Sequence, residues 1–344
     1  MKPTKKTFYL CEVEVTEGLE SITEAELQKY GAQIIARRPG EIDFRFVGDL
    51  STLLELKTIQ SISLMQNFPV PRPRALLSNE YLPLIFQQID TVLNLTLQTA
   101  FQTFFVSAAG SDTAIMLRIK TAIAEHTGLS PDDDRGDLWI RIRPGKEGGW
   151  VMLIRLSPRP LVTRSWRVCN LQGALNAATA HAMIALTKPS PDDAFANLGC
   201  GSATLLIERL TYGYCHLVLG FDNKTTHLRC AQANIDASGW DKKIYLQLAD
   251  MAQLPLAAAS INALCADLPF GQLSGSHQAN QRLYPLMLRE AARVARARAR
   301  FVLMTHEIRL MESVLLRDKL WLLEQTFQVN LRGLHPQIYV LQRL

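Results

Sequence analysis

The feature that most constrains the fold is a regular alternation of short apolar segments with helical ones in the C-terminal half of the chain. Strand followed by helix, repeated, is typical of a mostly parallel sheet with helices on both faces. We therefore expect a doubly wound, Rossmann-like α/β domain, closed by two antiparallel strands at 321–333 and 336–344. The apolar segments are DAFANLGCG (193–201), HLVLGFD (216–222), IYLQLAD (244–250), INALCADLPFG (261–271) and RARFVLMT (298–305).

The loop after the first of these strands, NLGCGSAT (197–204), has glycines where the strand turns into a helix. Glycine lets a backbone turn tightly and approach a ligand closely. Asp222 ends the next strand and Asp250 the third, where acidic residues can hydrogen-bond ribose hydroxyls. The loop has neither a GKS/T sequence nor a complete GxGxxG, so a nucleoside cofactor without phosphates fits better than a dinucleotide. The alternative is an ordinary strand-to-helix turn.

A second candidate motif, DLPFG, follows the apolar run INALCA. The carboxylate of Asp267 and nearby carbonyls, such as that of Leu268, can accept hydrogen bonds from a planar NH2 group. Pro269 fixes the backbone, and Phe270 can stack on a base. Such a site catalyses by holding an amine with its lone pair aimed at a methyl group. The alternative is a turn with no role beyond reversing the chain.

The N-terminal half divides at the proline-rich, basic stretch PVPRPRALLS (69–78), which is typical of a linker. The segment before it reads as a small α+β unit, and the segment after it as a small sheet covered by helices. We expect three domains, at residues 1–70, 71–163 and 164–344.

The motifs NLGCGSAT and DLPFG resemble the paired motifs of class I amino-methyltransferases, usually written DPFCGSGT and [DN]PP[YF]. The whole chain resembles the THUMP domain-containing RNA methyltransferases. FYLCEVEVTEGLE resembles the opening strand and turn of that family, QTFFVSAAG through WIRIRP resembles its THUMP core, and RPLVTRSWR with QGALNAATAHAMIAL resembles its entry into the catalytic domain. In that family a ferredoxin-like domain (here 1–70) and a THUMP domain (71–163) precede the catalytic domain.

The resemblance implies S-adenosyl-L-methionine as cofactor and the exocyclic N2 amine of a guanosine in the tRNA acceptor stem, position 6 type, as target. It also implies that the THUMP-like region binds the tRNA 3′ end. The cofactor-binding residues carried over are Asn197, Gly199, Cys200 and Gly201 near the methionine end, Asp222 and Asn223 at the ribose, Asp250 and Met251 at adenine, and Asp267. The catalytic residues carried over are Asp267, Leu268, Pro269 and Phe270.

The first motif departs from the family pattern. Asn197, Leu198 and Gly199 stand in place of Asp-Pro-Phe, and Ala203 replaces the last glycine. Asn197 still accepts a hydrogen bond but brings no charge, so weaker or lost cofactor binding is an alternative. The target could equally be ribosomal RNA or an adenine N6 amine, because the second motif accepts any planar amine. A third hypothesis is that the chain is an RNA-binding homologue that has lost methyl transfer.

The composition adds few constraints. A net charge of +5 is compatible with a polyanionic partner. The chain has no membrane-length apolar run and no signal-peptide pattern, so we expect a cytoplasmic monomer with no membrane partner. Six cysteines show no CxxC pair, so we expect buried thiols, with neither a disulfide framework nor a metal site. Cys265 in particular is expected in the core, not as a nucleophile.

Basic residues of the linker, the THUMP-like region and its exit are expected to face RNA, with plain outward-facing residues as the alternative. They are Arg72, Arg74, Arg141, Arg143, Lys146, Arg159, Arg164 and Arg167.

Overall fold

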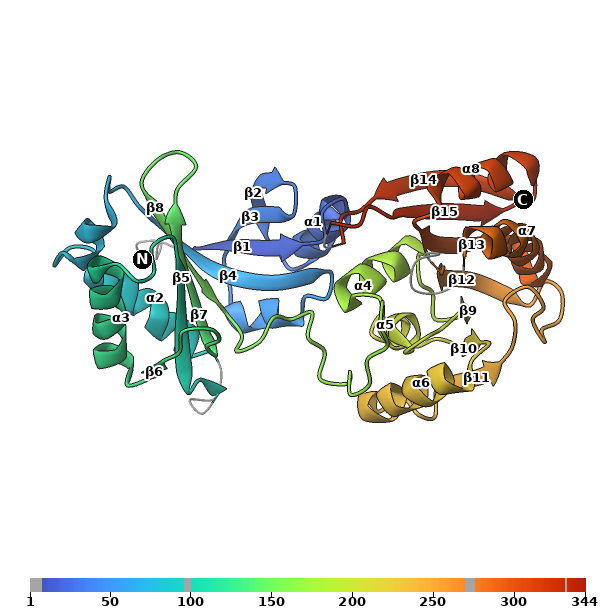
Figure 1. Ribbon diagram of the computed structural model, residues 1–344, viewed down its shortest axis with the longest axis horizontal. Coiled ribbons are helices and arrows are strands. Elements are labelled where there is room, and N and C mark those ends of the chain that lie inside the picture. The colour runs from blue at the N-terminus through green and yellow to red at the C-terminus, as the bar shows by residue number, and fades with distance from the viewer. Residues whose placement is uncertain (1–7, 96–99, 270–275, 332) are drawn as a thin grey trace, which may run out of the picture. The chain divides into compact units, whose positions relative to one another are not determined.

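The computed structural model describes residues 8–95, 100–269, 276–331 and 333–344, and these form two compact units (Figure 1). The first unit contains the described residues up to Val15 together with Thr23–Val162. The second unit contains Thr16–Ile22 and Thr163–Leu344. Among the described residues, no helix combines the length and apolar character needed to cross a bilayer.

The first unit is built on one sheet of order β2-β3-β1-β4-β8-β7-β5-β6. β4 pairs with β1 on one side and with β8 on the other, so a single sheet runs through both regions that the sequence assigns to separate domains. The division at residue 70 stays a prediction. The elements in chain order are β1 (Tyr9–Val15), α1 (Glu20–Lys29), β2 (Gln33–Arg38), β3 (Glu41–Phe46), η1 (Leu50–Glu55), β4 (Ile59–Phe68), η2 (Pro73–Leu77), α2 (Leu82–Leu93), β5 (Thr103–Ala108), α3 (Ala114–Thr127), β6 (Ser130–Pro131), β7 (Leu138–Pro144) and β8 (Trp150–Arg155).

Two helices of this unit bury one face each against its core. In α2 the buried residues Ile85, Ile89 and Val92 recur at helical spacing, and α3 repeats the pattern from Met116 to Ile123. This spacing is that of a single apolar stripe facing a sheet.

The second unit is a seven-stranded sheet of order β11-β10-β9-β12-β13-β15-β14. β9 to β13 are parallel, and β15 is antiparallel to both of its neighbours. The doubly wound, Rossmann-like fold class and its closing antiparallel pair, predicted from the sequence, are therefore confirmed. The elements are α4 (Ala177–Leu186), β9 (Ala194–Leu198), α5 (Thr204–Leu210), β10 (Leu217–Asp222), α6 (Thr225–Ser238), β11 (Ile244–Leu248), β12 (Ile261–Asp267), α7 (His277–Val294), β13 (Ala295–Thr305), α8 (Ile308–Arg317), β14 (Trp321–Gln328) and β15 (Gln337–Arg343).

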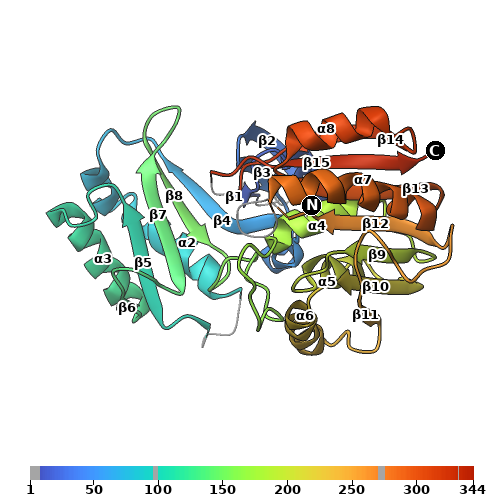
Figure 2. The same ribbon diagram turned by 45° about the vertical axis from the view of Figure 1, so that its right-hand side comes forward.

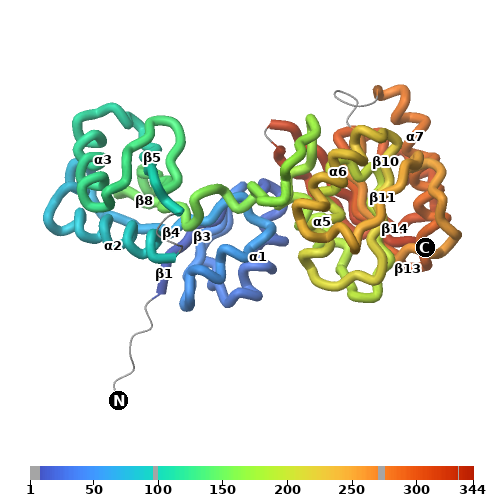
Figure 3. Tube along the Cα trace, turned by 90° about the horizontal axis from the view of Figure 1, so that it is seen from below, coloured from blue at the N-terminus to red at the C-terminus, as the bar shows by residue number. Residues whose placement is uncertain are grey.

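Helices cover both faces of this sheet. The strands lie between α4, α5 and α6 on one side and α7 and α8 on the other (Figures 2 and 3). The strand order reverses between β9 and β12, which are neighbours in the sheet. A crevice at the carboxyl ends of the strands, at such a switch point, is where open α/β sheets bind ligands.

The short segment Thr16–Ile22 packs with the second unit, although it precedes most of the first unit in the chain. The Thr16 hydroxyl hydrogen-bonds that of Thr179 in α4 at 3.0 Å. Gly18 has φ +95°, and a Cβ there would collide with the carbonyl oxygen of Gln328. Position 18 of the Gly18-Leu19-Glu20 turn therefore requires glycine, because its backbone packs against the end of β14.

Candidate active site

A cavity of about 570 Å³ opens at the switch point of the second unit. All eleven described residues that the sequence analysis assigned to the site line it, whereas Phe270 lies outside the described residues. Their individual roles stay predictions. These residues are Asn197, Gly199, Cys200, Gly201, Asp222, Asn223, Asp250, Met251, Asp267, Leu268 and Pro269.

The loop after β9 is shaped by three residues in the left-handed region. Gly199, Gly201 and Ala203 have φ of +68°, +53° and +68°. A Cβ at Gly199 would lie 2.9 Å from the Cε of Met251, the flexible end of that side chain, so the need for glycine at this position comes mainly from its backbone conformation. Ala203 precedes α5 in a conformation that L-residues adopt at a cost. This strained alanine stands where the related motif has its last glycine.

Asp222 ties this loop to the end of β10. One of its carboxylate oxygens accepts a hydrogen bond from the Gly201 amide at 2.9 Å. The other accepts from the Lys224 amide at 3.0 Å and lies 3.1 Å from Nδ1 of His227. A carboxylate has about four lone-pair positions, so Asp222 can organise both loops and still accept from a ligand hydroxyl.

Three residues that line the cavity, Asn197, Asp267 and Asn280, each have a buried side-chain oxygen with no hydrogen-bond partner among the described residues. Asn197 donates through Nδ2 to the Cys265 carbonyl at 3.1 Å, and this leaves its Oδ1 unpaired. Oδ1 of Asp267 is also buried and unpaired. Burial raises the pKa of Asp267 to about 8, because desolvation disfavours the carboxylate. Unpaired buried acceptors are uncommon in folded proteins and indicate a missing donor.

The segment 170–176 contains site residues that sequence reasoning missed. Residues 170–176 precede α4, which begins at Ala177. Asn176 is its N-cap and accepts from the amides of Ala178 and Thr179, which frees the preceding residues to form a loop. Leu171 to Leu175 line the cavity. An asparagine just before an alanine-rich run is the local signal that marks this boundary.

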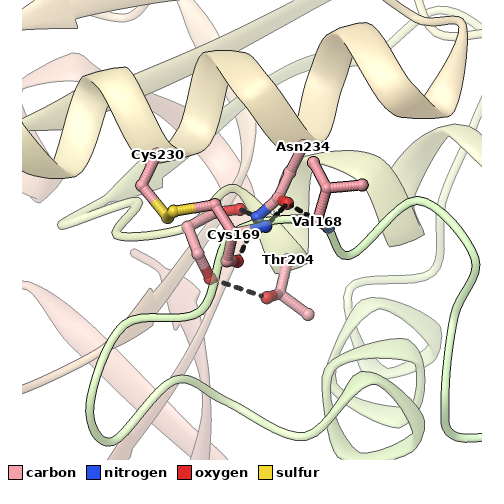
Figure 4. Close-up of a disulfide and its surroundings, with 6 residues drawn as sticks. Val168, Cys169, Thr204, Cys230 and Asn234 are labelled. Carbon is pink, nitrogen blue, oxygen red and sulfur yellow. Dashed lines mark hydrogen bonds between the residues drawn. A yellow bond between two sulfur atoms is a disulfide. The ribbon is translucent and has the colours of Figure 1, made fainter.

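A disulfide fastens this loop to α6, which corrects the expectation that the cysteines form no disulfide. Cys169 and Cys230 are bonded across 61 residues (Figure 4). Asn234 reinforces the link: its Oδ1 accepts from the amides of Val168 and Cys169, and its Nδ2 donates to the carbonyls of Cys169 and Ser202. The other four cysteines are buried free thiols as expected, and Cys265 is in the core.

A buried charge cluster lies on α5, the helix whose first residues line the cavity. Glu208 in α5 is fully buried, with Nε of Arg164 and Nδ1 of His181 each 2.8 Å from its carboxylate. Burial alone would raise the pKa of Glu208, but the His181 hydrogen bond and the Arg164 charge lower it overall. The expectation that Arg164 faces RNA is wrong, because its guanidinium neutralises this carboxylate. It is also wrong for Arg143, which pairs with buried Glu12 in the first unit.

Comparison with known proteins decides the family. A family model described as "UPF0020: RMKL-like, methyltransferase domain" matches residues 164–337, half of the chain. The chain belongs to this methyltransferase family. The methyltransferase is 31% identical over 183 residues to mouse "tRNA (guanine(6)-N(2))-methyltransferase THUMP3", a match that covers 49% of this chain but only 36% of the mouse protein. The chain thus spans about a third of the length of the curated relatives that it matches.

Solved structures share the fold. TrmN from Thermus thermophilus superimposes with a TM-score of 0.76 at 22% identity, over 98% of this chain and 100% of that chain. SMU.472, a putative methyltransferase complexed with SAH, gives a TM-score of 0.71 at 16% identity, over 98% of each chain. The predicted THUMP domain itself stays a prediction.

The residues of the cavity fit S-adenosylmethionine, the methyl donor of this methyltransferase family. When bound, it supplies an electrophilic methyl group on a positively charged sulfur. The cavity offers unpaired oxygen acceptors at Asn197 and Asp267 and a glycine backbone that allows close approach at Gly199. Its size is that of ordinary cofactor sites. Within the described ranges, no group of His, Cys, Asp and Glu side chains is arranged to hold a metal ion.

Proposed function

We propose that this methyltransferase transfers a methyl group from S-adenosylmethionine to the exocyclic N2 amine of a guanosine in tRNA, of the acceptor-stem position 6 type. The observation that carries the proposal is the unpaired, buried carboxylate oxygen of Asp267 in a cavity that the DLP segment lines. The name of the mouse relative, a tRNA guanine-N2 methyltransferase, supports the same target.

In this proposal the loop Gly199 to Gly201 lies against the methionine end of the cofactor. Asp222 accepts from the ribose hydroxyls, with Asn223 beside it, and Asp250 and Met251 contact adenine. Each of these residues lines the cavity. Asp250 is exposed and Met251 half-buried, as suits the open end of a nucleoside site.

Asp267 acts on the target base. Its carboxylate, together with the carbonyl of Leu268, accepts hydrogen bonds from the amine and directs the nitrogen lone pair at the methyl group. The bound cofactor would supply the methyl group, and the amine that receives it would release a proton. The raised pKa of Asp267 suits its carboxylate to receive that proton. Phe270 would stack on the flipped base.

The first unit would bind the tRNA 3′ end in this proposal, as a THUMP-type domain after a ferredoxin-like one. Arg72, Arg74 and Arg159 are exposed and, among the basic residues expected to face RNA, are the best placed to meet phosphate.

The test is methyl transfer from labelled S-adenosylmethionine to unmodified total tRNA, with nucleoside digestion and mass spectrometry. We expect N2-methylguanosine from the native protein and from Asp241→Ala, an exposed carboxylate outside the cavity, but not from Asp267→Ala. Label in N6-methyladenosine, or in ribosomal RNA alone, would refute the proposed target. Cofactor-induced thermal stabilisation without incorporation into any RNA would refute methyl transfer itself.

A further inference from the structure

Asn280 is a buried polar residue of the cavity that neither the motifs nor the comparisons point to. It lies in the first turn of α7, after the N-cap Ser276. Only 1% of it is exposed, yet it lines the same cavity as Asp267. Its Nδ2 donates a hydrogen bond to the carbonyl oxygen of Pro269 at 3.2 Å. Asn280 therefore fastens α7 to the DLP segment.

The contact with Pro269 fixes which way the amide points. A backbone carbonyl only accepts, so the NH2 of Asn280 must face it and Oδ1 must face away. That Oδ1 is buried and has no hydrogen-bond partner among the described residues. The Nδ2 donor of Asn280 is therefore used by the Pro269 carbonyl, whereas its Oδ1 acceptor is vacant.

Tyr284, one turn further along α7, makes this arrangement rigid. Its hydroxyl donates to the same Pro269 carbonyl at 3.3 Å and lies 2.7 Å from the Thr305 hydroxyl. Both Asn280 and Tyr284 come from a helix whose buried face is packed in the core, so neither donor is free to move away. Turning the Asn280 amide over would place its oxygen against a carbonyl oxygen.

Besides Oδ1 of Asn197 at the end of β9, the cavity therefore has two vacant oxygen atoms at the DLP segment, Oδ1 of Asn280 and Oδ1 of Asp267, and the contact with Pro269 fixes the polarity of Asn280. The Watson–Crick edge of guanine has two neighbouring donors, the ring N1–H and the N2 amine. That of adenine has one donor, the N6 amine, beside an acceptor, N1. The fixed acceptor of Asn280 beside an ionised Asp267 matches guanine and opposes adenine, since an acceptor facing N1 gains no hydrogen bond and repels it.

We infer that Asn280 is a specificity-determining residue that accepts a hydrogen bond from the N1–H of the target guanine, with Asp267 left to the amine. The inference rests on the proposed guanine-N2 activity. It assigns discrimination between purines to α7, outside both sequence motifs.

The test changes the substrate as well as the protein. An RNA with 2-aminopurine at the target position keeps the N2 amine and lacks the N1–H. We compare kcat/KM on guanosine and 2-aminopurine RNA for the native protein, Asn280→Ala and Tyr284→Phe. Tyr284→Phe is the matched control, because it also removes a donor to the Pro269 carbonyl but leaves the vacant Oδ1 of Asn280 in place.

We expect the native protein and Tyr284→Phe to favour guanosine by roughly tenfold to a hundredfold, the effect of leaving a buried acceptor unpaired. Asn280→Ala should lose most of that preference through a fall on guanosine alone. Equal losses on both substrates, or an unchanged preference, would overturn the inference while leaving the proposed function intact. No methylation of guanosine by the native protein would overturn both.

Discussion

The disulfide between Cys169 and Cys230 is expected to be a major source of stability. It closes a loop of 61 residues, which includes β9, α5 and β10. In the chain-entropy model, cross-linking a loop of this length removes about 4 kcal/mol of conformational freedom from the unfolded chain at 25 °C. Cys230→Ser should therefore lower the free energy of unfolding by about that amount.

The same substitution should also weaken cofactor binding, because Cys169 directly precedes the loop that lines the cavity. Leu171 to Leu175 would then be held by Asn176 at one end and by Asn234 at the other. Since Asn234 still bonds the Val168 and Cys169 amides, we expect the loop to loosen without leaving the site. Cys230→Ser should therefore change the free energy of cofactor binding by less than it changes the free energy of unfolding.

Urea unfolding of the native protein and Cys230→Ser, each with and without dithiothreitol, measures the effect. Reductant should bring the native protein to the midpoint of the variant and should leave the variant unchanged. Thiol counting under denaturing, non-reducing conditions should find four reactive cysteines in the native protein. Six thiols, or a variant as stable as the oxidised native protein, would refute the reasoning.

Three further predictions concern the cavity and the buried charge cluster of Glu208, Arg164 and His181. Glu208→Gln leaves a buried arginine without its counter-charge, and urea unfolding should show a loss of about 3–5 kcal/mol. Gly199→Ala strains the backbone in the cavity wall and displaces the end of the Met251 side chain, so it should weaken cofactor-induced thermal stabilisation, whereas Gly213→Ala, which strains the backbone outside the cavity with no atom within 4 Å, should retain it. Because burial raises the pKa of Asp267 to about 8, a cationic ligand must displace its proton. S-adenosylmethionine should therefore bind more tightly as pH rises from 6 towards about 8, with calorimetry detecting proton release, and S-adenosylhomocysteine, which lacks the sulfonium charge, should show a weaker dependence.

The parallel sheet and the site loops were predictable because each depends on local signals. Apolar segments alternating with helices fix a doubly wound sheet, and the switch point then brings the strand ends together. Asp222 and Asp267 are far apart in sequence but occupy equivalent places after their strands, so their convergence followed from topology.

Apart from the helix boundary that Asn176 marks, what sequence reasoning missed depends on pairings that have no local signal. Cys169 and Cys230 come together only after α6 has packed, with their Cα atoms 5.5 Å apart. Asn280 is an ordinary polar residue in a helical pattern, and its role depends on a carbonyl eleven residues earlier. Arg164 was expected at the surface because charge alone does not reveal a buried partner such as Glu208.

The charged side chains that line the cavity are mainly acidic. Asp222, Asp250 and Asp267 all line it, against the single lysine Lys224 and one histidine, among the residues that the structure describes. Such a lining favours a cationic ligand over one with phosphates. On the proposed function, a bound sulfonium charge would favour the ionised form of Asp267, and desolvation would again raise the pKa of its carboxyl once that charge is gone. The Asp267 carboxylate would then accept a hydrogen bond from the amine before methyl transfer and would take up its proton afterwards. Asp267 would serve both roles, because it is the only titratable residue of the DLP segment.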